Sequence, residues 1–99
     1  MEYYVIGDDD TVLGFSLVGV LGSACHNEVE AKSAWDGVLE NKNYGIIIIT
    51  EDVADMIRST VDRFLFSESF PLVVEIPAKG KRSSRDLRAL VNEAIGVSL

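Results

Sequence analysis

The amino-acid sequence predicts an α/β fold, a small three-layer α/β/α arrangement with a four-stranded parallel sheet. Three observations lead to this prediction. Apolar runs of strand length alternate along the chain with segments of helical periodicity. Residues 46–49 are four consecutive isoleucines, a run typical of a strand buried on both faces. The 99 residues, 47% of them hydrophobic, suit a single domain with one core.

The first strand is predicted over Tyr3 to Ile6 and is ended by Gly7. The apolar positions between Val12 and Val18 then fit a short helix that starts near Thr11. Gly19 is well placed to end that helix, because glycine readily takes the left-handed backbone conformation found there.

The second strand is predicted over residues 20–25, VLGSAC, although glycine, serine and alanine are poor strand formers. Asn27 and Glu30 follow at the spacing of a capping box, in which each side chain satisfies a free backbone N–H of a new helix. Apolar residues recur at helical spacing from Ala31 to Leu39, which predicts the second helix.

The third strand is the isoleucine run, and Thr50 starts a third helix after it. One face of that helix is expected to carry Val53, Ile57, Val61 and Phe64. The fourth strand is predicted over residues 71–77, bracketed by prolines that suit an edge strand or a strand end because proline lacks a ladder donor.

A last helix is predicted from Ser83 or Ser84 to about residue 95, with Gly96 ending it. Its inward-facing residues would be Leu87, Leu90, Val91, Ala94 and Ile95. The whole chain, 1–99, is expected to be one domain, with residues 83–95 as a candidate mobile element that binds a partner.

The predicted order of elements, βαβαβαβα, places helices on both faces of the sheet because parallel neighbours are joined by right-handed crossovers. We expect the strand order 2-1-3-4, a truncated flavodoxin-like or receiver-like fold. The isoleucine strand would lie inside the sheet and the proline-bracketed strand at its edge.

Three consecutive aspartates, Asp8–Asp10, follow the first strand, and Glu51 and Asp52 follow the third. Ligands bind beyond the carboxyl ends of such strands, and carboxylates suit Mg²⁺. A receiver-like Mg²⁺-binding regulatory domain is therefore one interpretation. A receiver, however, needs a phosphate-accepting aspartate at the end of the third strand, where this chain runs Ile49-Thr50-Glu51. The other interpretation is structural: acidic residues cap a helix and interact well with the positive end of its dipole. We expect the structural role and no metal.

The remaining candidates for a chemical site are weak. Cys25 and His26 are adjacent, and adjacent side chains of a strand point to opposite faces, so a catalytic pair is not expected. A single histidine and a single cysteine are too few for a zinc site. The sequence has no lysine-bearing phosphate loop. We therefore expect no catalytic residue and no cofactor.

The charge is acidic and unevenly distributed. A net charge of −7 argues against general nucleic-acid binding, which needs a basic surface. Residues 1–78 have four Lys/Arg and fourteen Asp/Glu, a balance of −10, whereas residues 79–99 have five and two, a balance of +3. The basic segment is either a solvated helix face or a docking surface for an acidic partner. With no apolar run near the ~20 residues of a membrane span, we expect a soluble, cytosolic protein without direct membrane insertion.

Four blocks of the sequence resemble a known family along nearly the whole chain. They are GDDDTVLGFSLVGV (residues 7–20), YGIIIITEDVA (44–54), PLVVEIP (71–77) and AIG (94–96), in that order. These blocks are similar to the F subunit of archaeal-type and vacuolar-type rotary ATPases.

The resemblance implies a non-catalytic component of the central stalk of such an ATPase, cytoplasmic and peripheral to the membrane. It implies binding to the coiled-coil shaft, which is the D subunit, and contacts with the catalytic head, and thereby a role in coupling ATP synthesis or hydrolysis to ion transport. Carried over to this chain, it makes Arg82, Arg85 and Arg88 candidate partner contacts. The loop of His26, Asn27 and Glu28 after the weak second strand is expected to be mobile or ordered by a partner, so it is a second candidate.

Overall fold

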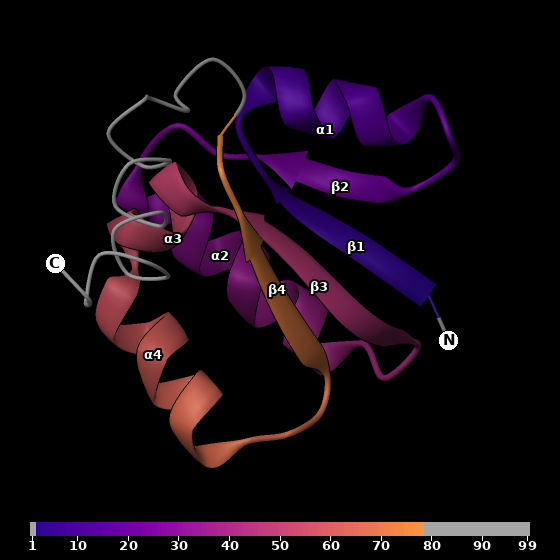
Figure 1. The fold of residues 1–99 in the computed structure, drawn as a ribbon. Coiled ribbons are helices and arrows are strands. Elements are labelled where there is room, and N and C mark those ends of the chain that lie inside the picture. The colour runs from indigo at the N-terminus through magenta and orange to yellow at the C-terminus, as the bar shows by residue number, and fades with distance from the viewer. Residues whose placement is uncertain (1, 79–99) are drawn as a thin grey trace, which may run out of the picture.

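Residues 2–78 fold as an alternation of strands and helices, and the description is confined to them, since Met1 and residues 79–99 lie outside the described part of this computed structural model (Figure 1). The elements are β1 (Glu2–Gly7), α1 (Asp9–Ser16), β2 (Leu21–Ala24), α2 (Glu28–Glu40), β3 (Tyr44–Thr50), α3 (Glu51–Met56), α4 (Arg58–Ser67) and β4 (Leu72–Ile76). The helix predicted over residues 83–95 lies outside the described residues.

The four strands form one parallel sheet in the order β2-β1-β3-β4, which confirms the predicted topology. The isoleucine strand β3 lies inside the sheet and β4 lies at its edge. The prolines flank β4 at positions 71 and 77, where a missing ladder donor costs nothing.

The helix starts follow the local signals, with shifts of a few residues. The first helix begins at Asp9 and not at Thr11, because Asp8 is its N-cap and accepts the Thr11 backbone N–H at 3.1 Å. Gly19 has a φ of +88°, the left-handed conformation expected of the residue that turns the chain after α1. Asn27 caps α2 by accepting the Glu30 backbone N–H at 2.9 Å.

The third predicted helix is interrupted, which is a correction to the sequence prediction. It runs as α3 and α4, with Ile57 between them at φ −127° and ψ 42°. The break keeps Val53 on α3 and Val61 on α4 in the same buried core. Neither glycine nor proline occurs between residues 51 and 67, so no local signal marks the break.

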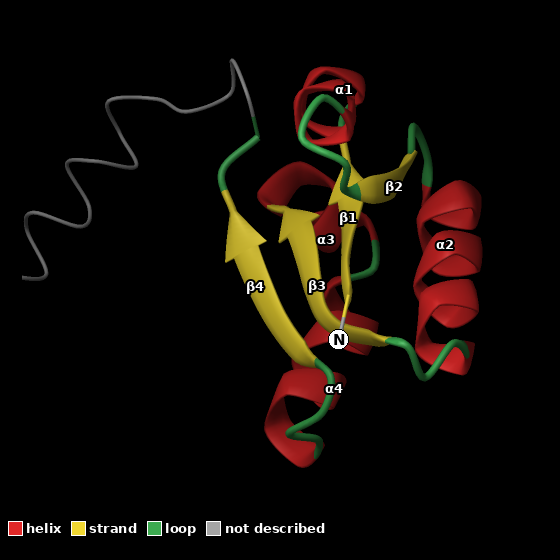
Figure 2. Ribbon diagram, turned by 90° about the vertical axis from the view of Figure 1, so that its right-hand side faces the viewer, coloured by secondary structure: helices red, strands yellow, loops and turns green. Residues whose placement is uncertain are grey.

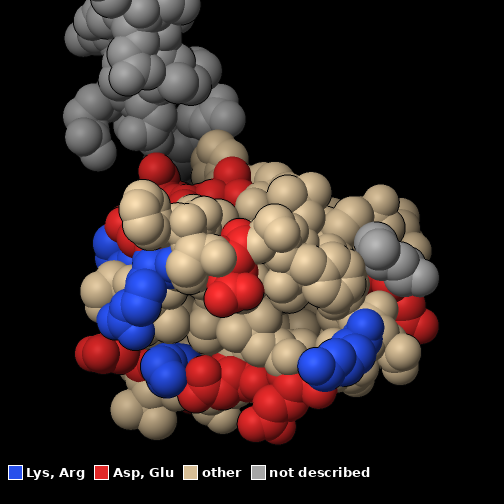
Figure 3. Space-filling view, turned by 90° about the horizontal axis from the view of Figure 1, so that it is seen from below, with Lys and Arg blue, Asp and Glu red and all other residues tan. Residues whose placement is uncertain are grey.

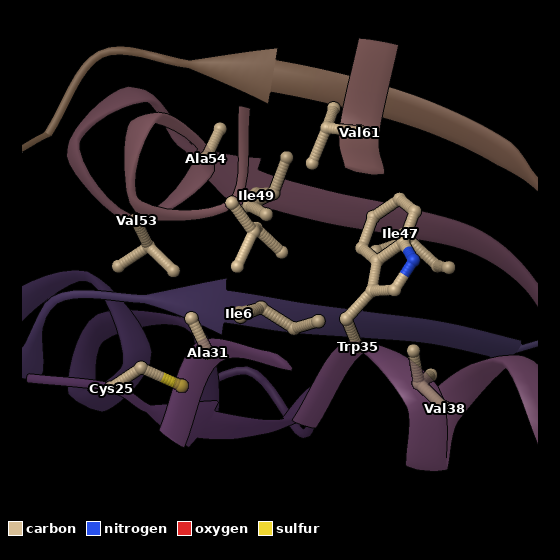
Figure 4. Packing of buried hydrophobic residues seen from close by; sticks show 11 residues of the cluster. Ile6, Cys25, Ala31, Trp35, Val38, Ile47, Ile49, Val53, Ala54 and Val61 are labelled. Atoms are coloured by element: carbon tan, nitrogen blue, oxygen red, sulfur yellow. The ribbon is translucent and has the colours of Figure 1, made fainter. Parts of the chain in front are cut away.

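The main core lies between the sheet and the layer formed by α2, α3 and α4 (Figures 2 and 4). Trp35 of α2 is fully enclosed there and meets Phe64 of α4 edge-on, with ring centroids 5.5 Å apart. From β1 and β3 this core receives Ile6, Ile47 and Ile49.

The opposite face of the sheet is covered only in part by described residues. Helix α1 packs on β1 and β2, where Val12 approaches Gly22 and Val5 is completely buried. Ile46 and Ile48 of β3 face the same way but are only half-buried. The prediction of a strand buried on both faces is therefore correct for one face and incomplete for the other within residues 2–78.

Candidate functional site

The carboxyl end of the sheet carries the aspartates that made this region a candidate metal site. Asp8 is occupied as a helix cap: besides the Thr11 backbone N–H, it accepts the Thr11 hydroxyl at 2.7 Å. Asp9 and Asp10 lie in the first turn of α1, where acidic side chains interact favourably with the helix dipole. The capping role predicted for this acidic stretch is thereby confirmed.

His26 connects the starts of two helices at this end of the sheet. Its Nε2 lies 2.9 Å from Asp9 Oδ1, and its Nδ1 lies 3.1 Å from Glu30 Oε1. The hydrogen bond and charge of Asp9, followed by those of Glu30, raise the pKa of the exposed imidazole. The Glu30 carboxylate also accepts the His26 backbone N–H at 2.8 Å, which is the main reason its own pKa is lowered.

At the end of β3, the acidic residues serve the next helix. Asp52 Oδ1 accepts the hydroxyl of buried Thr50 at 2.6 Å and the Val53 backbone N–H at 2.8 Å. Glu51 is exposed in the first turn of α3. Among residues 2–78, no three histidine, cysteine, aspartate or glutamate side chains are grouped as a metal ion would require. Asp52 thus bonds within the start of α3, whereas the N-cap residue Thr50 makes no side-chain capping hydrogen bond.

Cys25 and His26 are separated by their environments. The Cys25 thiol is buried in the core, with its Sγ 3.5 Å from the Glu30 carbonyl oxygen, and burial raises its pKa. The His26 ring instead lies exposed at the surface, so the two side chains do not form a nucleophile–base pair. Cys25 is thus a small buried residue of the core.

Arg58 is the centre of a second charged cluster, which the sequence analysis did not identify. Its guanidinium lies 2.7 Å from Glu75 Oε2 on β4 and 3.2 Å from Asp62 Oδ1 on α4. It also pairs with Asp55 of α3. These hydrogen bonds, that of Glu75 above all, raise the arginine pKa. The spacing of Asp55, Arg58 and Asp62 could have suggested the helical part, but Glu75 joins only through the tertiary fold.

The partly covered side of the sheet is a further feature of residues 2–78. We call it the open face and define it by Tyr3, Ile46, Ile48, Leu72 and Val74. Tyr3 pairs in register with Ile46, and Ile46 with Leu72, while Ile48 pairs with Val74. Tyr3, Leu72 and Val74 are 50%, 56% and 39% exposed, respectively. Figure 2 shows α2 to the right of the sheet and no described helix to the left of β4.

The predicted partner-binding residues form two groups, of which the structure describes one. His26, Asn27 and Glu28 are exposed where the chain passes from β2 into α2. His26 contacts the first turns of α1 and α2, Asn27 caps α2, and Glu28 is the first residue of α2. Arg82, Arg85 and Arg88 lie outside the described residues. None of the helices within residues 2–78 combines the length and apolar character needed to cross a bilayer.

Comparison with known proteins places this geometry in a family context. The sequence model of the ATP synthase (F/14-kDa) subunit family matches residues 4–93. The chain is 41% identical to the F subunit of the A-type ATP synthase of Pyrococcus furiosus, over 100% of this chain and 98% of that protein. It is 33% identical to the corresponding F subunit of Methanosphaera stadtmanae, over 96% of this chain and 92% of that protein.

A solved structure shares the fold. The crystal structure of the F subunit of the V-type ATP synthase from Archaeoglobus fulgidus superposes with a TM-score of 0.60 at 22% identity, covering 76% of this chain and 95% of that one.

Proposed function

Because the chain belongs to the ATP synthase (F/14-kDa) subunit family, which comprises the F subunits of A/V-type ATP synthases, we propose that it is a non-catalytic component of the central stalk. In this role it binds the coiled-coil shaft, the D subunit, and contacts the catalytic head. It helps to couple ATP synthesis or hydrolysis to ion transport, from the cytoplasmic side and peripheral to the membrane. The observation that carries the proposal is the match over residues 4–93, together with relatives aligned over nearly their full length.

The side chains at the carboxyl end of the sheet agree with a non-catalytic role. Asp8 and Asp52 hold helix starts, and Asp9 is paired with His26. As a mechanism we propose a rigid α/β body that binds the shaft, with the predicted helix of residues 83–95, in the basic segment 79–99, as an adjustable contact. Arg82, Arg85 and Arg88 would meet acidic surfaces of the shaft or the head.

Binding of the purified chain to the shaft protein from the same source tests the proposal. Size-exclusion chromatography with light scattering should show a one-to-one complex. Two folded proteins that elute separately at micromolar concentration would contradict it.

The role of the basic segment has its own test. The double variant Arg85→Glu/Arg88→Glu should weaken the complex, and by more at low salt than at high salt, because screening reduces charge–charge attraction. The variant Lys32→Glu/Lys42→Glu is a control that makes the same charge change on the described body. If the wild-type protein and the arginine variant bind the shaft protein with equal affinity at low salt, this segment is not part of the interface.

A further inference from the structure

His26, the only histidine of the chain, stands between the end of β2 and the start of α2. Its imidazole Nε2 lies 2.9 Å and 3.0 Å from the two carboxylate oxygens of Asp9, in the first turn of α1. Its Nδ1 lies 3.1 Å from Glu30 Oε1, in the first turn of α2. Figure 2 shows α1 at the top and α2 to the right of the sheet. The ring thus connects the starts of two helices that pack on different sides of the sheet.

Both ring nitrogens face groups that can only accept a hydrogen bond. An ionised carboxylate has no proton to donate, whereas a neutral imidazole has one N–H and one bare nitrogen. The two contacts can therefore both be hydrogen bonds only when the ring is doubly protonated, as the imidazolium cation. Loss of one proton turns one of the contacts into a meeting of two lone pairs, so that contact must open.

The contact with Glu30 is held by a second bond. Glu30 Oε1 also accepts the backbone N–H of His26 at 2.8 Å, so it cannot turn away from Nδ1 without giving up that bond. The Asp9 side chain is 70% exposed, and its hydrogen bonds among residues 2–78 are those to the ring. When the ring has a single proton, the proton is therefore best placed on Nδ1, and Asp9 is the group that leaves.

The other ionisable side chains of the surrounding elements are engaged elsewhere. The Cys25 thiol is buried in the core, where burial raises its pKa. Asp8 accepts the backbone N–H of Thr11, and Asp52 accepts that of Val53. Three exposed carboxylates of the helix starts make no hydrogen bond with the ring, namely Asp10, Glu28 and Glu51. Within residues 2–78, the charges that act directly on the ring are thus those of Asp9 and Glu30.

This cluster differs from the other ion pairs of the molecule in its response to pH. Figure 3 shows lysine and arginine side chains intermixed with acidic ones on the face seen from below. Lysine and arginine keep their charge near neutral pH, whereas histidine changes its charge in that range. Among the described ion pairs, those of His26 are therefore the ones that a proton can make or break near neutral pH.

We propose that His26 is a proton-dependent latch between α1 and the junction of β2 with α2. The imidazolium bridges Asp9 and Glu30, whereas the neutral ring keeps its proton on Nδ1 for Glu30 and releases Asp9. The proton that leaves is the one on Nε2, and it passes to water. Because the two carboxylates, that of Asp9 above all, raise the pKa of the ring, the latch opens at a higher pH than an unpaired histidine would.

The effect of the latch is local. The three side chains are about half exposed or more, and exposed ion pairs contribute little to global stability. Strand β2 has four residues and lies at the edge of the sheet, paired with β1 alone, so few other contacts hold its end in place. Residues 26–28 are those that the sequence predicts to be mobile or ordered by a partner. We expect this junction to be ordered by the protonated ring and to be more mobile when the ring is neutral.

NMR of the ¹⁵N-labelled full-length chain tests the latch from about pH 5 to about pH 9, a range that brackets the titration of histidine. The ¹⁵N shifts of the imidazole distinguish the cation from the two neutral tautomers. We expect the cation at low pH and the Nδ1–H tautomer at high pH, whereas unbound histidine favours Nε2–H. The backbone amide signals of Asp10 and Thr11 should shift with the same midpoint as the ring.

Two variants separate the parts of the latch. His26→Gln removes the titrating ring at an exposed position, and the amide shifts of Asp10 and Thr11 over this range should be lost. Glu30→Ala removes the group that holds Nδ1, so the neutral ring should take the Nε2–H tautomer and keep its bond to Asp9. The control Asp36→Asn, farther along α2, should leave the tautomer and the amide shifts as in the wild type.

Two results would overturn the inference in a chain whose amide spectrum shows that it is folded. An Nε2–H tautomer of the wild type at high pH would mean that Asp9 stays bound to the neutral ring. Amide signals of Asp10 and Thr11 that do not follow the midpoint of the ring would mean that the contact with α1 is not formed in solution. Neither result bears on binding to the shaft protein, which is measured separately.

Discussion

The Nε2 atom of His26 lies 2.9 Å from Oδ1 of Asp9, a residue 17 positions earlier in the chain. This contact joins the segment before α2 to the first turn of α1. Glu30 contacts the ring from its other side, at Nδ1. The pair is exposed, so we expect it to respond to pH and to contribute little to global stability.

The first prediction concerns the titration of His26. Its pKa in the folded protein is raised from 6.5, chiefly by the hydrogen bond to Asp9, and Asp9→Asn should move it back down. NMR of the imidazole protons between pH 5 and 9 measures both values. The control is Asp36→Asn, which alters a carboxylate paired with Lys32 on α2 and should not change the pKa of His26.

The sign of the accompanying stability change follows from the raised pKa. The folded state binds the proton more tightly than the unfolded chain, so the contribution is fully present below pH 6.5 and is lost as pH rises through the folded pKa. The melting temperature of the wild type should therefore fall slightly across that window relative to His26→Gln. If the melting temperature of the wild type instead rose relative to that of His26→Gln with increasing pH, the raised pKa of His26 would be contradicted.

The second prediction concerns the cap of α1. Asp8→Ala removes the acceptor for the Thr11 backbone N–H and should lower the free energy of unfolding by about 0.5–2 kcal/mol. Asp8→Asn should restore most of the loss, because asparagine caps about as well. Asp10→Ala, in the first turn, should cost less than Asp8→Ala in the same urea titration. Equal losses for the two alanine variants would show that charge, and not capping, sets the effect.

The third prediction concerns Gly22 of β2. A Cβ atom built at Gly22 would lie 2.6 Å from the Val5 carbonyl oxygen, with Val12 of α1 also close, so Gly22→Ala should destabilise the protein by about 1–3 kcal/mol. Gly37 of α2 has nothing within 4 Å of such an atom, and Gly37→Ala should stabilise the helix by about 0.5–1 kcal/mol. Thermal unfolding of the two variants should give shifts of opposite sign. A Gly22→Ala protein as stable as wild type would mean that Val5 of β1 does not approach Gly22 so closely.

The fourth prediction concerns Arg58, whose guanidinium joins α3, α4 and β4. Arg58→Lys should lose about 0.5–1 kcal/mol, since an ammonium group cannot reproduce the forked contacts with Glu75 and Asp55. Arg63→Lys on the exposed side of α4 is the matched control and should be nearly neutral. A double-mutant cycle with Glu75→Gln isolates the Arg58–Glu75 coupling, and a coupling of zero would show that the pair is not formed in solution.

Local patterns predicted most of the secondary structure. The alternation of apolar runs with helical periodicity, and the caps Asp8 and Asn27, depend on residues within a turn of each other, so the sequence displays them directly. The parallel order 2-1-3-4 also followed, because short connections and right-handed crossovers leave few arrangements for four strands. The break at Ile57 did not follow, since no glycine or proline marks it.

The sequence by itself thus determined the fold class, the sheet order and the helix-capping role of the aspartates. Tertiary structure alone decided which carboxylate faces His26, that Glu75 completes the Arg58 cluster, and that Ile46 and Ile48 share a partly uncovered face with Leu72 and Val74. The physical reason is distance along the chain. Register across a parallel sheet and contacts between crossover helices join residues far apart in sequence, and no pattern within one element specifies them.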